Sequence, residues 1–141
     1  MSEQEEIGRY VHILSRQIKR KIDEVVAKYD VTSVQCAILG YIYEASQDKE
    51  VYAKDIENKF NMRRATVAEI LSLMEKNGLI ERMANKQDAR LKKIILKEKS
   101  LEIKNKVKEE ISKVEKEIQQ GISKEEMDIF KKVIQKMSKN I

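Results

Sequence analysis

The sequence predicts a mainly α-helical fold with one short β-hairpin, and three observations support that class. The 141 residues contain no proline and only 4 glycines, so few residues are present that would interrupt a helix. Apolar side chains recur every three or four residues along most of the chain, which is the spacing of one helix face. Between residues 79 and 96, two short apolar runs flank a polar segment instead, which is typical of two strands and their connecting loop.

A long first helix is predicted over residues 5–29, because seven apolar residues there form one stripe: Ile7, Val11, Leu14, Ile18, Ile22, Val25 and Tyr29. A second helix follows and extends to about Ala45. Thr32 and Gln35 have the spacing of a capping box at its start, in which each side chain accepts a hydrogen bond from a free backbone amide.

Two shorter helices are predicted over residues 53–60 and 63–77, with a tight turn between them. Asn61 fits that turn, because asparagine tolerates a positive φ better than most residues. Gly78 suits the end of the second of these helices, where the backbone commonly becomes left-handed. Two helices joined in this way form a helix-turn-helix in outline.

The strand candidates are residues 79–83 and 93–96, and the polar segment between them spans residues 84–90. A hairpin that directly follows a helix-turn-helix is a wing. We therefore expect a winged helix-turn-helix, with a three-helix core and a β-hairpin wing, over residues 31–97.

Long helices are expected on both sides of this domain. The helical spacing resumes at Glu98, and a second capping box at Ser123 and Glu126 begins a last helix. The apolar stripes of the terminal helices exceed what the middle segment can cover. A second copy in a twofold dimer would bury them most simply, and packing among the three helices is the alternative. We accordingly expect residues 1–30 and 98–141 to form a helical dimerisation region.

Positive charge is concentrated in the predicted winged helix. Residues 54–97 contain 11 basic and 6 acidic residues, a net charge of +5, and the rest of the chain is balanced. A local basic patch is the electrostatic footprint of a protein that binds polyanions, because each cation near a phosphate releases condensed counterions. A solvated lysine-rich surface is an equally good explanation of the charge alone.

Several function classes lack support in the sequence. No apolar run approaches the roughly 18 residues of a membrane span, and the first ten residues lack the pattern of a signal peptide. One cysteine, Cys36, and one histidine, His12, cannot form an internal disulfide or a structural zinc site. No catalytic set and no glycine-rich phosphate loop is recognisable. We therefore expect a soluble cytoplasmic protein that is not an enzyme and needs no metal or cofactor.

The chain order of these predicted elements resembles that of the MarR family of bacterial winged-helix transcription regulators. The most specific similarity is Asp88-Ala89-Arg90 followed by a strand that ends at Leu96, which resembles the wing motif of that family. Further similarities are the helix exit over residues 73–80, Thr66-Val67, Arg82, and Thr32 with Gln35 and Leu39. The resemblance implies a homodimeric regulator of transcription, commonly a repressor, that a small aromatic ligand or oxidation releases from DNA.

The exposed face of residues 63–77 supplies the candidates for contacts in the DNA major groove. Ala65 and Ala68 allow close approach to thymine methyl groups, and Arg64 has the shape to bind guanine through two hydrogen bonds. Glu69 is able to accept a hydrogen bond from cytosine, but we expect it to pair with a neighbouring arginine instead.

On the wing, Arg90 is the candidate for insertion into the minor groove, where narrow A·T tracts concentrate negative potential. Asp88 is expected to support the wing by orienting Arg90, Arg82 or a backbone amide. Phosphate contacts are expected from residues at the helix start and on the wing: Arg63, Thr66, Asn85, Lys86 and Lys92. In a dimer, two such units would contact successive major grooves of a near-palindromic site in double-stranded DNA.

Two features bear on regulation. His12 and Arg16 lie one turn apart on the first predicted helix and are candidates for a pocket that binds an anionic aromatic effector, although such groups are more often simply exposed. Cys36 lies in an apolar stretch and is expected to be a structural thiol rather than an oxidation sensor. Two other functions stay open: a helical protein-interaction adaptor whose winged helix no longer binds DNA, and an architectural DNA binder without sequence preference.

Overall fold

The computed structural model describes residues 6–141, and within them it contains six helices and one two-stranded antiparallel sheet. The elements are, in chain order, α1 (Ile7–Ala27), α2 (Ser33–Ala45), α3 (Ala53–Phe60), α4 (Arg64–Lys76), β1 (Ile80–Ala84), β2 (Lys92–Leu96), α5 (Glu98–Ile118) and α6 (Lys124–Lys139). This architecture confirms the predicted fold class. No helix within residues 6–141 is long and apolar enough to cross a membrane.

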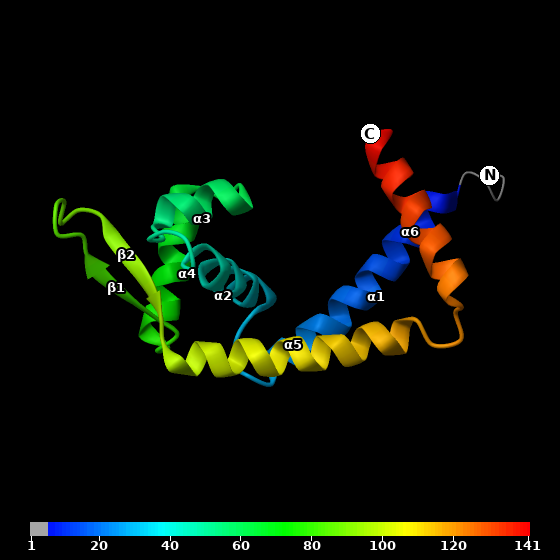
Figure 1. Ribbon diagram of the computed structural model, residues 1–141, viewed down its shortest axis with the longest axis horizontal. Coiled ribbons are helices and arrows are strands. Elements are labelled where there is room, and N and C mark those ends of the chain that lie inside the picture. The colour runs from blue at the N-terminus through cyan, green and yellow to red at the C-terminus, as the bar shows by residue number, and fades with distance from the viewer. Residues whose placement is uncertain (1–5) are drawn as a thin grey trace.

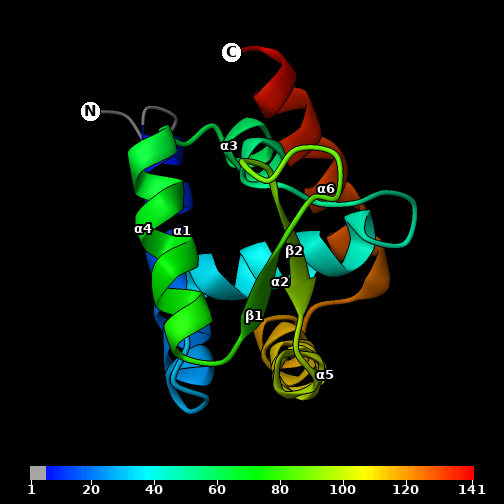
Figure 2. The ribbon, with the colours of Figure 1, turned by 90° about the vertical axis from the view of Figure 1, so that its left-hand side faces the viewer.

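The molecule is elongated, with the winged helix at one end (Figure 1). Helix α5 runs from the base of the hairpin to the other end, where α6 folds back and where the start of α1 and the C-terminus lie. Figure 2 views the molecule from the wing, with the hairpin in front of α2 and α4 beside β1. The exposed surface of the hairpin and of α4 therefore belongs to the end that is remote from α6.

The core lies where α2, α3, α4 and the hairpin meet. Its most deeply buried side chains come from all of these elements: Ile38, Leu39, Ile42, Ile56, Val67, Leu71, Met74 and Ile80. The rings of Tyr41 and Phe60 close one side of this core in an edge-to-face contact at 5.9 Å. Ser100, at the start of α5, is also buried and donates its hydroxyl hydrogen to the Leu79 carbonyl oxygen, which joins α5 to the wing domain.

The local signals that the sequence predicts at helix ends are confirmed. Thr32 Oγ1 accepts from the Gln35 amide at 3.1 Å, and Gln35 Oε1 accepts from the Thr32 amide at 3.1 Å. Asn61 has a φ of 50° in the turn between α3 and α4, and Gly78 has a φ of 75° after α4. Helix α1 ends two residues before the predicted limit, because the chain turns through Asp30, whose φ is 57°.

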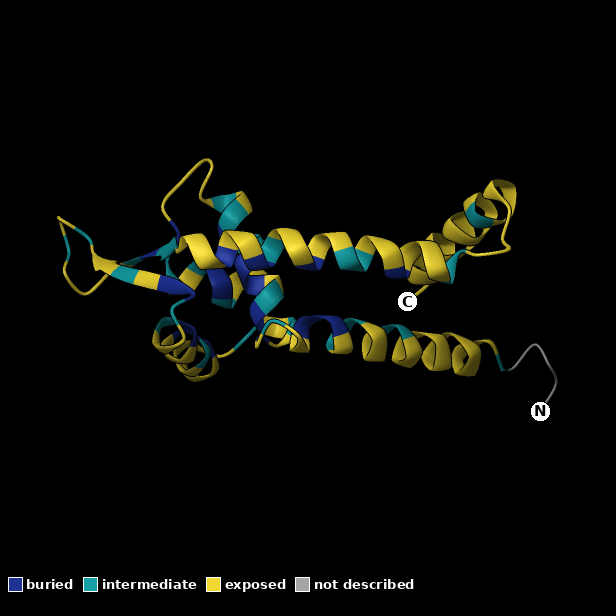
Figure 3. Ribbon diagram, turned by 90° about the horizontal axis from the view of Figure 1, so that it is seen from below, coloured by how far each residue is buried: buried dark blue, intermediate teal, exposed yellow. Residues whose placement is uncertain are grey.

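Burial is uneven along the molecule, as Figure 3 shows. The last turns of α1 bury Val25 and Val26, and α1 packs on α5 and α2, whereas the first half of α1 is largely exposed. Helix α6 has no buried residue. Large apolar side chains are exposed on both helices: Ile7, Tyr10, Val11, Ile13 and Leu14 of α1, and Ile129, Phe130, Val133, Ile134 and Met137 of α6.

Candidate nucleic-acid interface

Helix α4 presents one face to the core and the opposite face to solvent. Val67, Leu71 and Met74 are fully buried, because they recur every three or four residues and lie on one side of the helix. The predicted DNA-contacting residues of this segment all lie on the exposed side: Arg63, Arg64, Ala65, Thr66, Ala68 and Glu69. The short alanine side chains leave the helix surface open to close approach by another molecule.

The N-terminus of α4 is suited to an anion. Arg63 is the N-cap residue, and its side chain forms no capping hydrogen bond. The amides of the first turn consequently have no partner within the helix and point outward at the positive end of the helix dipole. Arg63, Arg64 and Thr66 surround this end and are exposed, so a phosphate group placed here would meet both cations and free amide donors.

The expected ion pair of Glu69 with a neighbouring arginine is absent among residues 6–141. The reason is geometric, since side chains on a helix meet at separations of three or four residues, and Arg64 and Arg63 lie five and six residues before Glu69. Glu69 is therefore an exposed carboxylate on the solvent-facing side of α4.

The wing is an antiparallel hairpin in which Ile80 pairs with Leu96 and Ala84 with Lys92. Its loop, residues 85–91, is closed by a 2.8 Å hydrogen bond from the Asn85 amide to the Leu91 carbonyl oxygen. Lys86, Arg90 and Lys92 are all exposed, and the Arg90 side chain is 91% accessible. The hairpin thus carries these cations well away from the core.

Asp88 contacts Arg90 in the way that the sequence suggests. Asp88 Oδ1 accepts from the Arg90 amide at 3.0 Å and from Arg90 Nε at 3.2 Å. These hydrogen bonds hold the pKa of the Asp88 carboxyl below its ordinary value, so the carboxylate persists at neutral pH. Asp88 thus holds the Arg90 guanidinium itself, through Nε and through Nη2, which lies 3.4 Å from Asp88 Oδ2, although the Arg90 side chain remains 91% accessible.

Arg82 pairs with Glu75 on α4 and not with Asp88. Its Nη2 atom lies 3.0 Å from Glu75 Oε1, and its backbone amide donates to Glu75 Oε2 at 3.2 Å. Arg82 therefore joins β1 to α4. Glu75 was not singled out in the sequence, because a pair seven residues apart across a helix end and a strand start has no periodic signature.

A cationic groove of about 450 Å³ lies between α3, α4 and the wing. The basic side chains that line it are Lys54, Arg64, Arg82, Arg90 and Lys92, and Glu57 is the acidic residue among its lining. Sequence reasoning missed Lys54, which reaches this groove from the start of α3. Residues from α4, the second helix of the helix-turn-helix and so its recognition helix, and from the wing therefore meet at one positively charged surface, which fits a polyanion.

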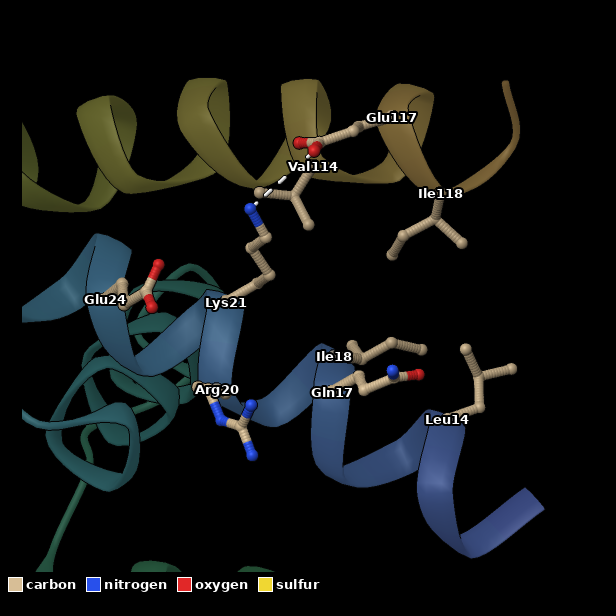
Figure 4. A pocket seen from close by; sticks show the side chains of 9 residues that line it. All are labelled: Leu14, Gln17, Ile18, Arg20, Lys21, Glu24, Val114, Glu117 and Ile118. Carbon is tan, nitrogen blue, oxygen red and sulfur yellow. Dashed lines mark ion pairs between the residues drawn. The ribbon is translucent and has the colours of Figure 1, made fainter. Parts of the chain in front are cut away.

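The candidate effector residues lie elsewhere. His12 and Arg16 are exposed on the first half of α1 and do not line the groove of about 440 Å³ between α1 and α5. Figure 4 shows that Leu14, Ile18 and Ile118 face this groove and that Lys21 pairs with Glu117 across it, at 3.6 Å. Within the described chain, residues 6–141, no cluster of three or more His, Cys, Asp or Glu side chains could hold a metal ion.

A three-helix core, an exposed recognition helix and a basic wing define a winged helix-turn-helix protein. Residues 31–92 match the model of the MarR family, and the fold is that of the winged-helix regulators of this family. This result confirms the resemblance that the wing motif and the α4 exit suggest.

The relatives agree with this match. YsmB of Bacillus subtilis (strain 168), described as an uncharacterized HTH-type transcriptional regulator, is 24% identical over 132 residues, which are 94% of this chain and 88% of YsmB. MepR, a transcription regulator of the Staphylococcus aureus multidrug efflux pump MepA, has a TM-score of 0.82 at 25% identity, covering 95% of this chain and 97% of MepR. The S. aureus MepR–DNA complex has a TM-score of 0.77 at 25% identity and covers 99% of both chains.

Proposed function

We propose that this protein is a sequence-specific regulator of transcription that binds double-stranded DNA as a homodimer and represses the genes beside its operator. One observation carries the proposal: the exposed face of α4 and the wing cation Arg90 border the same cationic groove. A duplex placed there would have α4 in its major groove and the wing beside its minor groove. The likeness to a DNA-bound MepR structure supports this placement.

In this proposal the residues of α4 have distinct roles. Arg64, Ala65, Ala68 and Glu69 contact base edges, since they lie on the exposed face of the helix. Phosphate contacts come from Arg63 and Thr66 at the start of α4 and from Lys86 and Lys92 on the wing. Arg90 enters the minor groove with Asp88 as its support, and Arg82 supports the wing by joining β1 to α4.

The homodimer is supported by the apolar surface that a single chain leaves uncovered. Helix α6 buries none of its residues, although Phe130 and Ile134 lie on one face of it. Contiguous apolar surface of this extent is unusual on a monomer and marks an interface. A twofold dimer through residues 1–30 and 98–141 would place two copies of α4 about one helical turn apart on a near-palindromic operator.

We extend the proposal to regulation by a small anionic aromatic ligand that releases the protein from DNA. His12 and Arg16 are the candidate ligand-binding groups, because they lie one turn apart and are exposed. A ligand that binds better to one spacing of the two winged helices would shift the dimer toward that spacing and so change its DNA affinity.

The test is the selection of bound duplexes from a random pool at about 0.15 M salt, where non-specific binding is already weakened. Enrichment of an inverted repeat supports a dimeric, sequence-specific regulator. Binding without enrichment that fades as salt rises contradicts it in favour of an architectural binder. Absence of binding contradicts it in favour of an adaptor, provided that the purified protein is dimeric and carries no bound ligand by mass spectrometry.

A further inference from the structure

Within residues 6–141, one side-chain hydrogen bond joins the wing loop, residues 85–91, to another part of the structure. Asn85 Nδ2, at the start of the loop, donates to the hydroxyl oxygen of Tyr52 at 2.7 Å. Tyr52 directly precedes α3, so this contact crosses from the wing to the helix-turn-helix. Among the hydrogen bonds and ion pairs of residues 6–141, no other one links residues 85–91 to another element.

The Tyr52 hydroxyl is itself held in place. It donates to Glu50 Oε2 at 2.6 Å, and the Glu50 carboxylate also pairs with Lys93 at 3.6 Å. The hydrogen bond from Tyr52 keeps the pKa of Glu50 below its ordinary value, so Glu50 remains an acceptor at neutral pH. With its hydrogen directed to Glu50, the Tyr52 oxygen offers its lone pairs to Asn85.

From Asn85 the hydrogen bonds continue to the tip of the wing. Asn85 Oδ1 accepts from the amides of Gln87 and Asp88, at 2.7 and 3.1 Å. Asp88 in turn accepts from the amide and the side chain of Arg90. An unbroken series of hydrogen bonds therefore runs from Tyr52 to Arg90.

The other connections of the hairpin lie nearer its base. The Ile94 amide donates to the Val51 carbonyl oxygen at 2.8 Å, and Arg82 pairs with Glu75 at the level of the third residue of β1. A two-stranded hairpin is only marginally rigid by itself, so its far end moves unless something else holds it. The contact with Tyr52 supplies that support at the point where the loop begins.

We infer that Tyr52 is a positioning residue for the wing: its hydroxyl holds the loop of residues 85–91, through Asn85, at the angle to α4 that lets Arg90 and the recognition helix contact one duplex together. The inference rests on the proposed function, because it assumes that the wing binds DNA. Tyr52 lines the same cationic groove as Arg90, which is the geometry that this role requires.

The test is Tyr52→Phe, which removes the hydroxyl and keeps the ring and the backbone amide that donates to Asp55. We expect the affinity for the selected inverted-repeat duplex to fall about threefold to tenfold, the range that one hydrogen bond of this kind supplies. In the free protein, amide hydrogen exchange at Gln87 and Asp88 should become faster, while β1 and β2 exchange as before. Tyr43→Phe is the matched control, since the Tyr43 hydroxyl has no hydrogen-bond partner within residues 6–141.

A double-mutant cycle with Arg90→Ala separates positioning from a general structural role. If Tyr52 acts through Arg90, then Tyr52→Phe costs less than about twofold in the Arg90→Ala background. An equal loss in both backgrounds, or wild-type affinity of Tyr52→Phe, would overturn the inference. If Arg90→Ala binds like the wild type, Arg90 has no role in DNA binding and the inference fails. The proposed function fails only if the wild type selects no inverted repeat, and the exchange data then still report whether Tyr52 holds the loop.

Discussion

The carboxylate of Glu75 on α4 accepts two kinds of hydrogen bond from Arg82 on β1, one from the guanidinium at 3.0 Å and one from the backbone amide at 3.2 Å. A carboxylate that accepts from both the side chain and the main chain of one residue fixes that residue in position and in orientation. The wing consequently leaves α4 at a defined angle, and the recognition helix and the hairpin form one rigid surface.

Replacing Glu75 by glutamine tests the strength of this junction. The carboxylate is partly exposed, so screening limits the loss of stability at neutral pH to roughly 0.5 kcal/mol. Arg82 holds the pKa of Glu75 below the ordinary 4.5, so the pair stabilises the fold above about pH 4.5 and loses its effect as pH falls through the lowered value. Urea unfolding of the wild type and of E75Q at about pH 7 and about pH 3 measures the loss of stability and its dependence on pH. A difference between wild type and E75Q that is as large at pH 3 as at pH 7 would show that the charge of Glu75 has no part in it.

The elements of the fold were predictable because their signals are local. The apolar stripe of residues 7–29, the capping box at Thr32 and the left-handed Asn61 each depend on neighbours within four residues. The exposed face of α4 followed from the same periodicity. Contacts between residues of different elements leave no such local signal in the sequence, so they could not be predicted.

Tyr52 with Asn85 is a clear case, since 33 residues separate them and only the packing of the wing beside α3 brings them together. The prediction that Glu69 pairs with an arginine was wrong because residues close in the sequence need not point toward each other. Charge and proximity in sequence suggested it, but helix geometry directs Glu69 away from Arg64, whereas Glu75 is placed to meet Arg82. Which side chains pair thus depends on the direction in which each one points, and composition and spacing along one element do not specify that direction.

The wing arginine gives the most direct test of the DNA interface. Arg90→Ala should weaken binding to the selected duplex by about 1–3 kcal/mol, with a smaller loss on a scrambled duplex, because minor-groove insertion depends on the local shape of the site. Fluorescence anisotropy with both duplexes at the same salt concentration measures the two affinities. Arg16→Ala removes the same kind of charge from α1 and should leave both unchanged in the absence of effector. Equal losses on the two duplexes would reduce Arg90 to a general electrostatic contact.

Cys36 is expected to be insensitive to oxidation. Burial raises the pKa of its thiol, so the reactive thiolate is scarce at neutral pH and becomes more abundant only as the pH rises. Peroxide treatment should therefore leave the DNA affinity of the wild type equal to that of Cys36→Ala, and a thiol reagent should react slowly at about pH 7. Release of the wild type from DNA by peroxide, with Cys36→Ala still bound, would instead identify Cys36 as a sensor.

The apolar face of α6 provides the test of the dimer. Phe130 and Ile134 are about 43% and 39% exposed in the single chain, and a second copy would have to bury them. Replacing both by aspartate would place two charges in that interface, so the protein should sediment as a monomer while its far-ultraviolet circular dichroism stays that of the wild type. Lys132→Asp, which lies on the opposite side of α6, should remain dimeric. A monomer presents only one α4 to the operator. The double variant should therefore lose most of its affinity for the inverted repeat and keep its affinity for a half-site. If the protein stays dimeric with both substitutions, the dimer interface does not use this face of α6.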